Sequence, residues 1–222
     1  MIVASRMRRP VHTVGPHDTL GYAHLLMVNR RVRHLPVVQD GRLVGILSNR
    51  DIRGALPPPT ALEEARAQME KLLTMPVSSV MTREVHTVGP TTSIEHCAML
   101  MARHKIGCLP VLAANRLEGI ITTTDVLEVL AEMLGVSTPG ARLEVEVSAA
   151  RGSISKVTGI IEKQGIPIAS IASLPMADRA RLLLVMRVRT VNTGPVIKAL
   201  ESAGYAIARV QAVPGAEPGR AS

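Results

Sequence analysis

Two pairs of a hydroxyl and a carboxylate are spaced so that each could bind a sugar. Ser48 precedes Asp51 by three residues, and Thr122 precedes Asp125 by the same spacing. Both vicinal hydroxyls of a ribose can donate to one carboxylate, and a Ser or Thr oxygen beside it extends the hydrogen-bond network. Capping of a following helix is the alternative role, because Ser and Thr are favoured N-cap residues.

Basic residues that could bind a phosphate are distributed unevenly around these pairs. Arg33 and His34 directly precede a Leu-Pro-Val sequence, and Arg50 directly precedes the first carboxylate. The corresponding positions around the second Leu-Pro-Val sequence and the second carboxylate carry Gly107, Cys108 and Thr124. Phosphate binding uses charge-assisted hydrogen bonds, so these cations are candidates, although each could also be a solvated surface residue.

An internal repeat explains why these features occur twice. Residues 7–56 align without gaps on residues 81–130. Apolar periodicity and turn residues predict the order βαββα for each copy. In the first copy the strands are expected at 11–14, 35–38 and 43–47, and the helices at 20–30 and after residue 49. Each copy is too small to bury its apolar face alone, so we expect the two to pack about a pseudo-twofold axis.

The repeat resembles a tandem of CBS domains over residues 1–135. The resemblance rests on the Met-containing opening, the Leu-Pro-Val strand and the Gly-x-x-Ser/Thr-x-x-Asp exit of each copy. It implies an α/β disc, with a first repeat at 1–60, a connecting helix at 61–76 and a second repeat at 77–136. It also implies that AMP, ADP, ATP or a related adenosyl ligand binds in the clefts between the halves.

The same resemblance assigns roles to individual residues. Because aromatic side chains are nearly absent, the implied adenine slot is aliphatic, although core packing is the alternative role for its members, Val11, Pro36, Ile46, Val85 and Ile120. In related pairs, basic residues of one half reach the nucleotide whose ribose the other half holds. By that rule Arg33 and His34, helped by Arg50, would serve the ligand on Asp125, which predicts one tight site there.

Composition limits the other functions that this chain could have. The formal net charge of +8 favours anionic ligands. With no Phe or Trp, only two Tyr and no dense basic run, nucleic acid is disfavoured as a partner. Two cysteines are too few for a disulfide framework, and no pair with metal-ligand spacing accompanies them, so no metal site is expected. No apolar run approaches the length of a membrane span, and no export signal is expected at the N-terminus.

A second domain is predicted at 141–213, followed by a disordered tail at 214–222. Strands at 143–148, 168–174, 181–189 and 205–213, with helices at 153–164 and 195–203, give the ferredoxin-like order βαββαβ. The sequences Arg151-Gly-Ser-Ile-Ser-Lys-Val and Gly-Ile-Pro-Ile at 165–168 resemble the signature of ACT domains. That resemblance implies dimerisation and makes Gly152 a candidate backbone ligand for an amino acid. Ala149 and Pro167 replace the polar groups of serine-binding relatives, so binding should be weak or absent.

This domain order is similar to that of the bacterial proteins named for acetoin utilisation. We therefore expect a cytoplasmic homodimer that senses an adenine nucleotide and regulates an unidentified target protein. It should have no active site and no catalytic cofactor. Two alternatives remain: a nucleic-acid-binding regulator that uses the basic surface, and an enzyme. The sequence contains no Gly-rich phosphate loop, HExxH, CxxC or Gly-x-Ser-x-Gly element to support the second.

Overall fold

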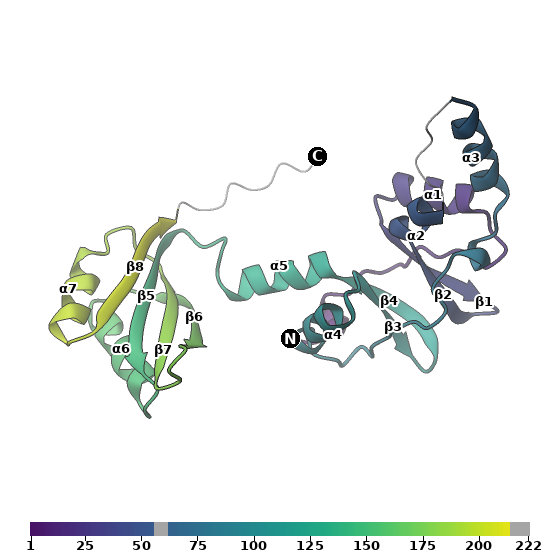
Figure 1. Cartoon of the computed structure of the whole chain (residues 1–222). Helices are drawn as coiled ribbons and strands as arrows, with labels where there is room; N and C mark the ends of the chain where they lie inside the picture. The colour runs from purple at the N-terminus through teal and green to yellow at the C-terminus, as the bar shows by residue number, and fades with distance from the viewer. Residues whose placement is uncertain (56–61, 214–222) are drawn as a thin grey trace. The chain divides into compact units, whose positions relative to one another are not determined.

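The computed structural model describes residues 1–55 and 62–213, which form two compact units. The first unit comprises residues 1–127 and the second begins at residue 128 (Figure 1). The expected proline stop at 57–59 and the expected tail at 214–222 lie outside the described residues. No described helix combines the length and the apolar character that crossing a membrane would require.

The first unit contains the first sequence repeat and most of the second, whose last helix continues past residue 127. Each repeat supplies one antiparallel two-stranded sheet, β1 with β2 and β3 with β4, flanked by helices. The elements in chain order are η1 (Val3–Ser5), α1 (Leu20–Asn29), β1 (His34–Gln39), β2 (Arg42–Ser48), α2 (Asn49–Ala55), α3 (Leu62–Thr74), η2 (Val77–Ser79), α4 (Ile94–His104), β3 (Cys108–Ala113), β4 (Arg116–Thr122) and α5 (Thr123–Met133). The helices and hairpins therefore begin and end close to the predicted residues.

The prediction of a strand at residues 11–14 is wrong. Within this segment only Val14 pairs, in a single parallel bridge with Val37. Val14 donates its N–H to the carbonyl of Pro36 and accepts a bond from Val38 N–H. The next bonds of a parallel ladder would need the N–H groups of residues 16 and 36, and both are proline. Val88 of the second repeat forms the same single bridge.

The opening segments of the two repeats are exchanged. Val3 donates its N–H to the carbonyl of Thr92 in the second repeat, and Val77 donates to the carbonyl of Asp18 in the first, both at 2.8 Å. The core of the first half consequently includes Val77 and Met81, which are fully and 92% buried, respectively, beside residues of α1, β1, β2 and α2. Each half is thus completed by residues that the sequence assigns to the other repeat.

The second unit contains all six elements expected after residue 140, in the expected order. They are β5 (Gly140–Ser148), α6 (Ser153–Lys163), β6 (Ile168–Pro175), β7 (Arg181–Val188), α7 (Gly194–Ser202) and β8 (Ala206–Val213). The four strands form one antiparallel sheet in the order β6-β7-β5-β8. Both helices pack on one face of it, where Val157, Ile161, Val196 and Leu200 join the apolar side chains of β5 and β7 in a single core (Figure 1).

Candidate functional site

A cleft of about 610 Å³ lies within the first unit, and residues of both repeats line it. The first repeat contributes the end of β2 and the start of α2, with Ile46, Ser48 and Asp51. The second repeat contributes the segment before α4 and the start of β3, including Val85 and Cys108. A cavity of this volume is typical of sites for small molecules and cofactors.

Each hydroxyl–carboxylate pair begins a helix and caps it. Ser48 donates both its backbone N–H and its hydroxyl to Oδ2 of Asp51, each at 2.7 Å. The hydroxyl of Ser48 also accepts a bond from the N–H of Asp51 at 3.3 Å. Thr122 and Asp125 repeat this arrangement, with donor distances of 2.8 and 2.6 Å to Oδ2. The capping role is therefore present in both copies, and in both it uses only one carboxylate oxygen.

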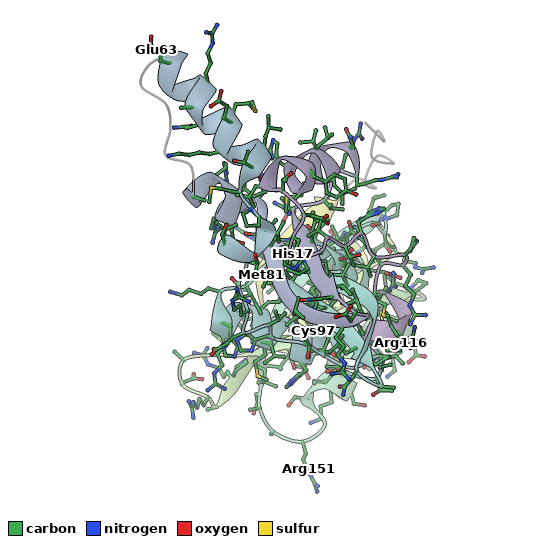
Figure 2. The ribbon with its side chains drawn as sticks, turned by 90° about the vertical axis from the view of Figure 1, so that its right-hand side faces the viewer. His17, Glu63, Met81, Cys97, Arg116 and Arg151 are labelled. Carbon is green, nitrogen blue, oxygen red and sulfur yellow. The ribbon has the colours of Figure 1, made fainter. Side chains whose placement is uncertain are left out.

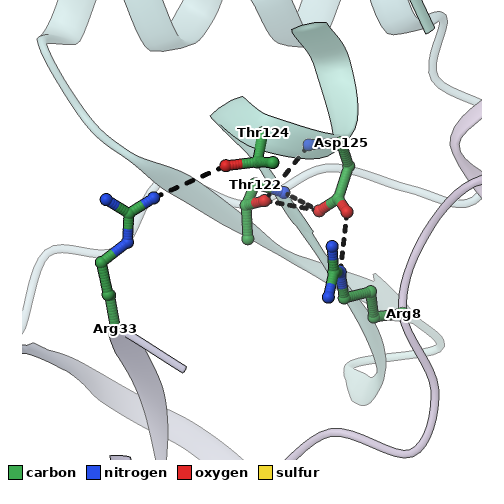
Figure 3. Close-up of polar contacts among 5 residues, drawn as sticks. All are labelled: Arg8, Arg33, Thr122, Thr124 and Asp125. Atoms are coloured by element: carbon green, nitrogen blue, oxygen red, sulfur yellow. Dashed lines mark hydrogen bonds and ion pairs between the residues drawn. The ribbon is translucent and has the colours of Figure 1, made fainter. Parts of the chain in front are cut away.

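The second carboxylate oxygen is what distinguishes the two copies. Oδ1 of Asp125 accepts a bond from Nε of Arg8 at 2.7 Å, and the Asp125 side chain is only 6% exposed (Figure 3). Asp51 is half-buried and lines the cleft, and within the described residues Oδ1 of Asp51 has no hydrogen-bond partner. Of these two Asp residues, only Asp51 therefore presents an available carboxylate oxygen to this cleft.

Basic side chains surround the same cleft. Arg33 and Arg50, both predicted from the sequence, line it together with Arg53 and Lys105, whereas Glu84 and Asp51 are the acidic residues in the lining. Permanent cations thus outnumber carboxylates around the cavity, which favours an anionic ligand. Arg33 also extends toward the start of α5, where its Nη2 lies 3.5 Å from Oγ1 of Thr124 (Figure 3).

His34 packs across the interface between the two repeats. A Cβ built on Gly107 would lie 2.9 Å from both Cε1 and Nε2 of the His34 ring, so any larger residue at this position would require the ring to shift. Burial lowers the pKa of His34, and the positive charges of Arg33 and Arg50 lower it further against the opposing effect of Asp51. His34 therefore lines the cleft as a neutral imidazole near neutral pH.

The structure brings only some of the predicted binding residues into the cleft. Ile46 and Val85 of the expected adenine slot line it with Ser48 and Asp51. The remaining predicted residues are absent from the lining among the described positions: Val11, Pro36, Ile120, Thr122 and Asp125. Pro36 and Ile120 are instead buried in the β1–β2 and β3–β4 hairpins.

Sequence reasoning missed several residues of the lining, among them Thr82, Glu84, His86, Arg53 and Lys105. A signal for Thr82 was present in the sequence, because the gapless repeat aligns it with Arg8 and so places a hydroxyl in one copy where the other has a cation. Lys105 lies opposite Arg31 in the same alignment, and both adopt positive φ at the end of a helix. Arg53 gave no such signal, since only the position of α2 beside the cavity brings it there.

The comparisons with known proteins agree with the architecture of the first unit. The CBS domain model matches residues 3–58 and 77–132, about half of the chain. The chain belongs to the CBS domain family. The CBS domain-containing protein YhcV of Bacillus subtilis is 36% identical over 123 residues, which cover 55% of this chain and 81% of YhcV.

Solved structures of other CBS proteins resemble the first unit. The crystal structure of a Vibrio cholerae protein named for acetoin utilization (AcuB) superposes with a TM-score of 0.51 at 34% identity, covering 61% of this chain and 94% of that one. The structure of CBSX2 in complex with AMP gives a TM-score of 0.50 at 28% identity, covering 60% of this chain and 97% of that one. CBS relatives of this chain thus include one with a bound adenine nucleotide.

The remaining candidate groups show little reactive character. Cys97 and Cys108 are buried free thiols, and burial raises the pKa of Cys108 to about 12. Within residues 1–55 and 62–213, no three His, Cys, Asp or Glu side chains gather as metal ligands would. In the second unit, Gly152 is the N-cap of α6 with a φ of 82°, next to Arg151 at the exposed tip of its loop (Figure 2).

Proposed function

We propose that this CBS protein is a regulatory sensor that binds AMP, ADP or ATP in the cleft beside Asp51. The observation that carries the proposal is the available Oδ1 of Asp51 in a cavity with a cationic rim. A ribose would donate its two hydroxyls to this carboxylate. The AMP complex of the related CBSX2 supports the choice of an adenine nucleotide.

The other groups of a nucleotide also find suitable partners in the cleft. Ile46 and Val85 offer aliphatic surface for the adenine, and Arg33, Arg50 and Lys105 offer positive charge for the phosphates. This placement moves the preferred site from Asp125, which the sequence comparison favoured, to Asp51. The reason is that Arg8 already bonds the free oxygen of Asp125.

For the second unit we propose an ACT-like domain of the ferredoxin type at residues 141–213, following CBS repeats at 1–60 and 77–136. The element order and the strand order β6-β7-β5-β8 support this assignment. Its role would be to form a homodimer or to bind a second small ligand near Gly152. We further propose that the sensor is cytoplasmic, has no catalytic activity and acts on a target protein in acetoin or central carbon metabolism, as the similarity to AcuB suggests.

Calorimetry with AMP tests the nucleotide site directly. A regulatory ligand must bind one state of the protein better than another, so measurable affinity is the first requirement. Asp51→Ala removes both ribose bonds, and charged hydrogen bonds of roughly 1.5–3 kcal/mol predict a loss of at least about 10-fold in affinity. Asp125→Ala is the matched control and should change the affinity little. Wild-type affinity in Asp51→Ala would refute the assignment.

A further inference from the structure

Arg8 and Thr82 occupy equivalent backbone positions in the two halves. Arg8 exchanges two backbone hydrogen bonds with Ile120, at 2.9 and 3.3 Å, and Thr82 exchanges two with Ile46, both at 2.9 Å. Both contacts are antiparallel bridges to the strand that ends at the hydroxyl–carboxylate pair. The backbone therefore presents the two side chains to the two pairs in the same way.

The side chains at this position have opposite consequences. Thr82 lines the open cleft beside Asp51, while Arg8 bonds Oδ1 of Asp125 at 2.7 Å. The Arg8 side chain is itself 58% exposed, whereas the carboxylate that it bonds is nearly buried. The choice between Arg and Thr at this repeat position therefore decides whether the neighbouring carboxylate oxygen is already bonded or remains available.

We propose that Arg8 occupies the second ribose site from within the chain, so that each chain binds a single nucleotide. The guanidinium N–H donates to the oxygen that a ribose hydroxyl would otherwise reach, and it does so as a charge-assisted bond. A nucleoside could enter only by displacing Arg8 from a nearly buried carboxylate. This inference rests on the proposed function, because it assumes that the carboxylate oxygen is the ribose acceptor.

The hydroxyl–carboxylate pair of the second site has the same geometry as that of the first. The bonds from Thr122 to Asp125 agree within 0.1 Å with those from Ser48 to Asp51. Arg33 reaches Thr124 at the start of α5 and could attract a phosphate there. Removing the Arg8 side chain should therefore be enough to open this site.

Exchanging the two side chains tests the inference on the full-length protein. We expect AMP calorimetry to give a stoichiometry of about one for the wild type and about two for Arg8→Thr. The reciprocal variant Thr82→Arg should weaken the first site by at least about 10-fold, since it brings a guanidinium to Asp51. Arg9→Thr is the matched control, because Arg9 pairs with the exposed Glu118 and should not change the stoichiometry.

The possible outcomes separate this inference from the proposed function. Two equivalent sites in the wild type, one site in a folded Arg8→Thr protein, or unchanged binding in Thr82→Arg would each overturn the role of Arg8. The Asp51 cleft stands in each case if Asp51→Ala still loses affinity. No binding by the wild type but one site in Arg8→Thr would support the role of Arg8 and overturn the Asp51 cleft. Absence of AMP binding in every variant would overturn both. Arg8→Ala gives the same test if Arg8→Thr does not fold.

Discussion

The exchanged opening segments predict that a residue of the second repeat stabilises the first. Val77 is fully buried in the core of the first half. Val77→Ala deletes two methyl groups, which costs about 0.8 kcal/mol of transfer free energy for each, and the void left behind adds roughly another 1 kcal/mol. The expected loss in unfolding free energy is therefore about 2 to 3 kcal/mol.

Tyrosine fluorescence can assign this loss to the correct unit. The chain has no tryptophan and two tyrosines, Tyr22 on α1 in the first unit and Tyr205 in the second. In a Tyr205→Phe background, urea unfolding followed at Tyr22 should show a midpoint lower by roughly 1 M for Val77→Ala, at an unchanged slope. Val28→Ala is the control, because Val28 lies on α1 and is 59% exposed. A Val77→Ala midpoint equal to that of the control would refute the exchanged packing.

Two further predictions concern titratable groups in or near the cleft. Because burial and neighbouring cations hold the pKa of His34 below its ordinary value of 6.5, the unfolded state binds the proton more tightly, so stability should fall as pH drops through 6.5 toward the lowered pKa. His34→Gln should remove that component from urea unfolding curves measured between about pH 5 and about pH 8, and an unchanged pH profile would contradict the assigned environment of His34. Burial holds the pKa of Cys108 near 12, so mass spectrometry should find its alkylation by iodoacetamide at mildly alkaline pH slow in the native protein and fast in urea. Rapid native modification of Cys108 would show that the thiol is accessible.

Local sequence signals were sufficient to predict the helices and hairpin strands, but they did not show where strand pairing stops. The apolar face of the first helix and the turn residues of the first hairpin predicted α1, β1 and β2 within about two residues of their observed ends. The strand expected at residues 11–14 failed because Pro16 and Pro36 remove the N–H groups that a longer ladder needs. Both prolines are visible in the sequence, but the register that sets them against this segment is a tertiary property.

The candidate site shows a similar division. The repeat alignment identified Ser48, Asp51 and the cations Arg33 and Arg50, all of which line the cleft. It could not show which carboxylate remains available, because that depends on a contact between residues 8 and 125, which are far apart in the chain. The alignment also showed that Arg8 and Thr82 differ. Only the structure shows that a backbone bridge places each of these residues against a strand of the opposite half.

The exchanged openings also constrain how the protein can form during synthesis. The first half lacks Val77 and Met81 until the chain has been made to residue 81. The segment around Val3 and Arg8 is made well before its partners, Thr92 and Ile120. At roughly 5 to 20 residues per second, about 6 to 22 s separate residue 8 from residue 120 on the ribosome. During that interval Arg8 cannot form its backbone bridge to Ile120, so the second half closes only when these two distant segments of the CBS pair meet.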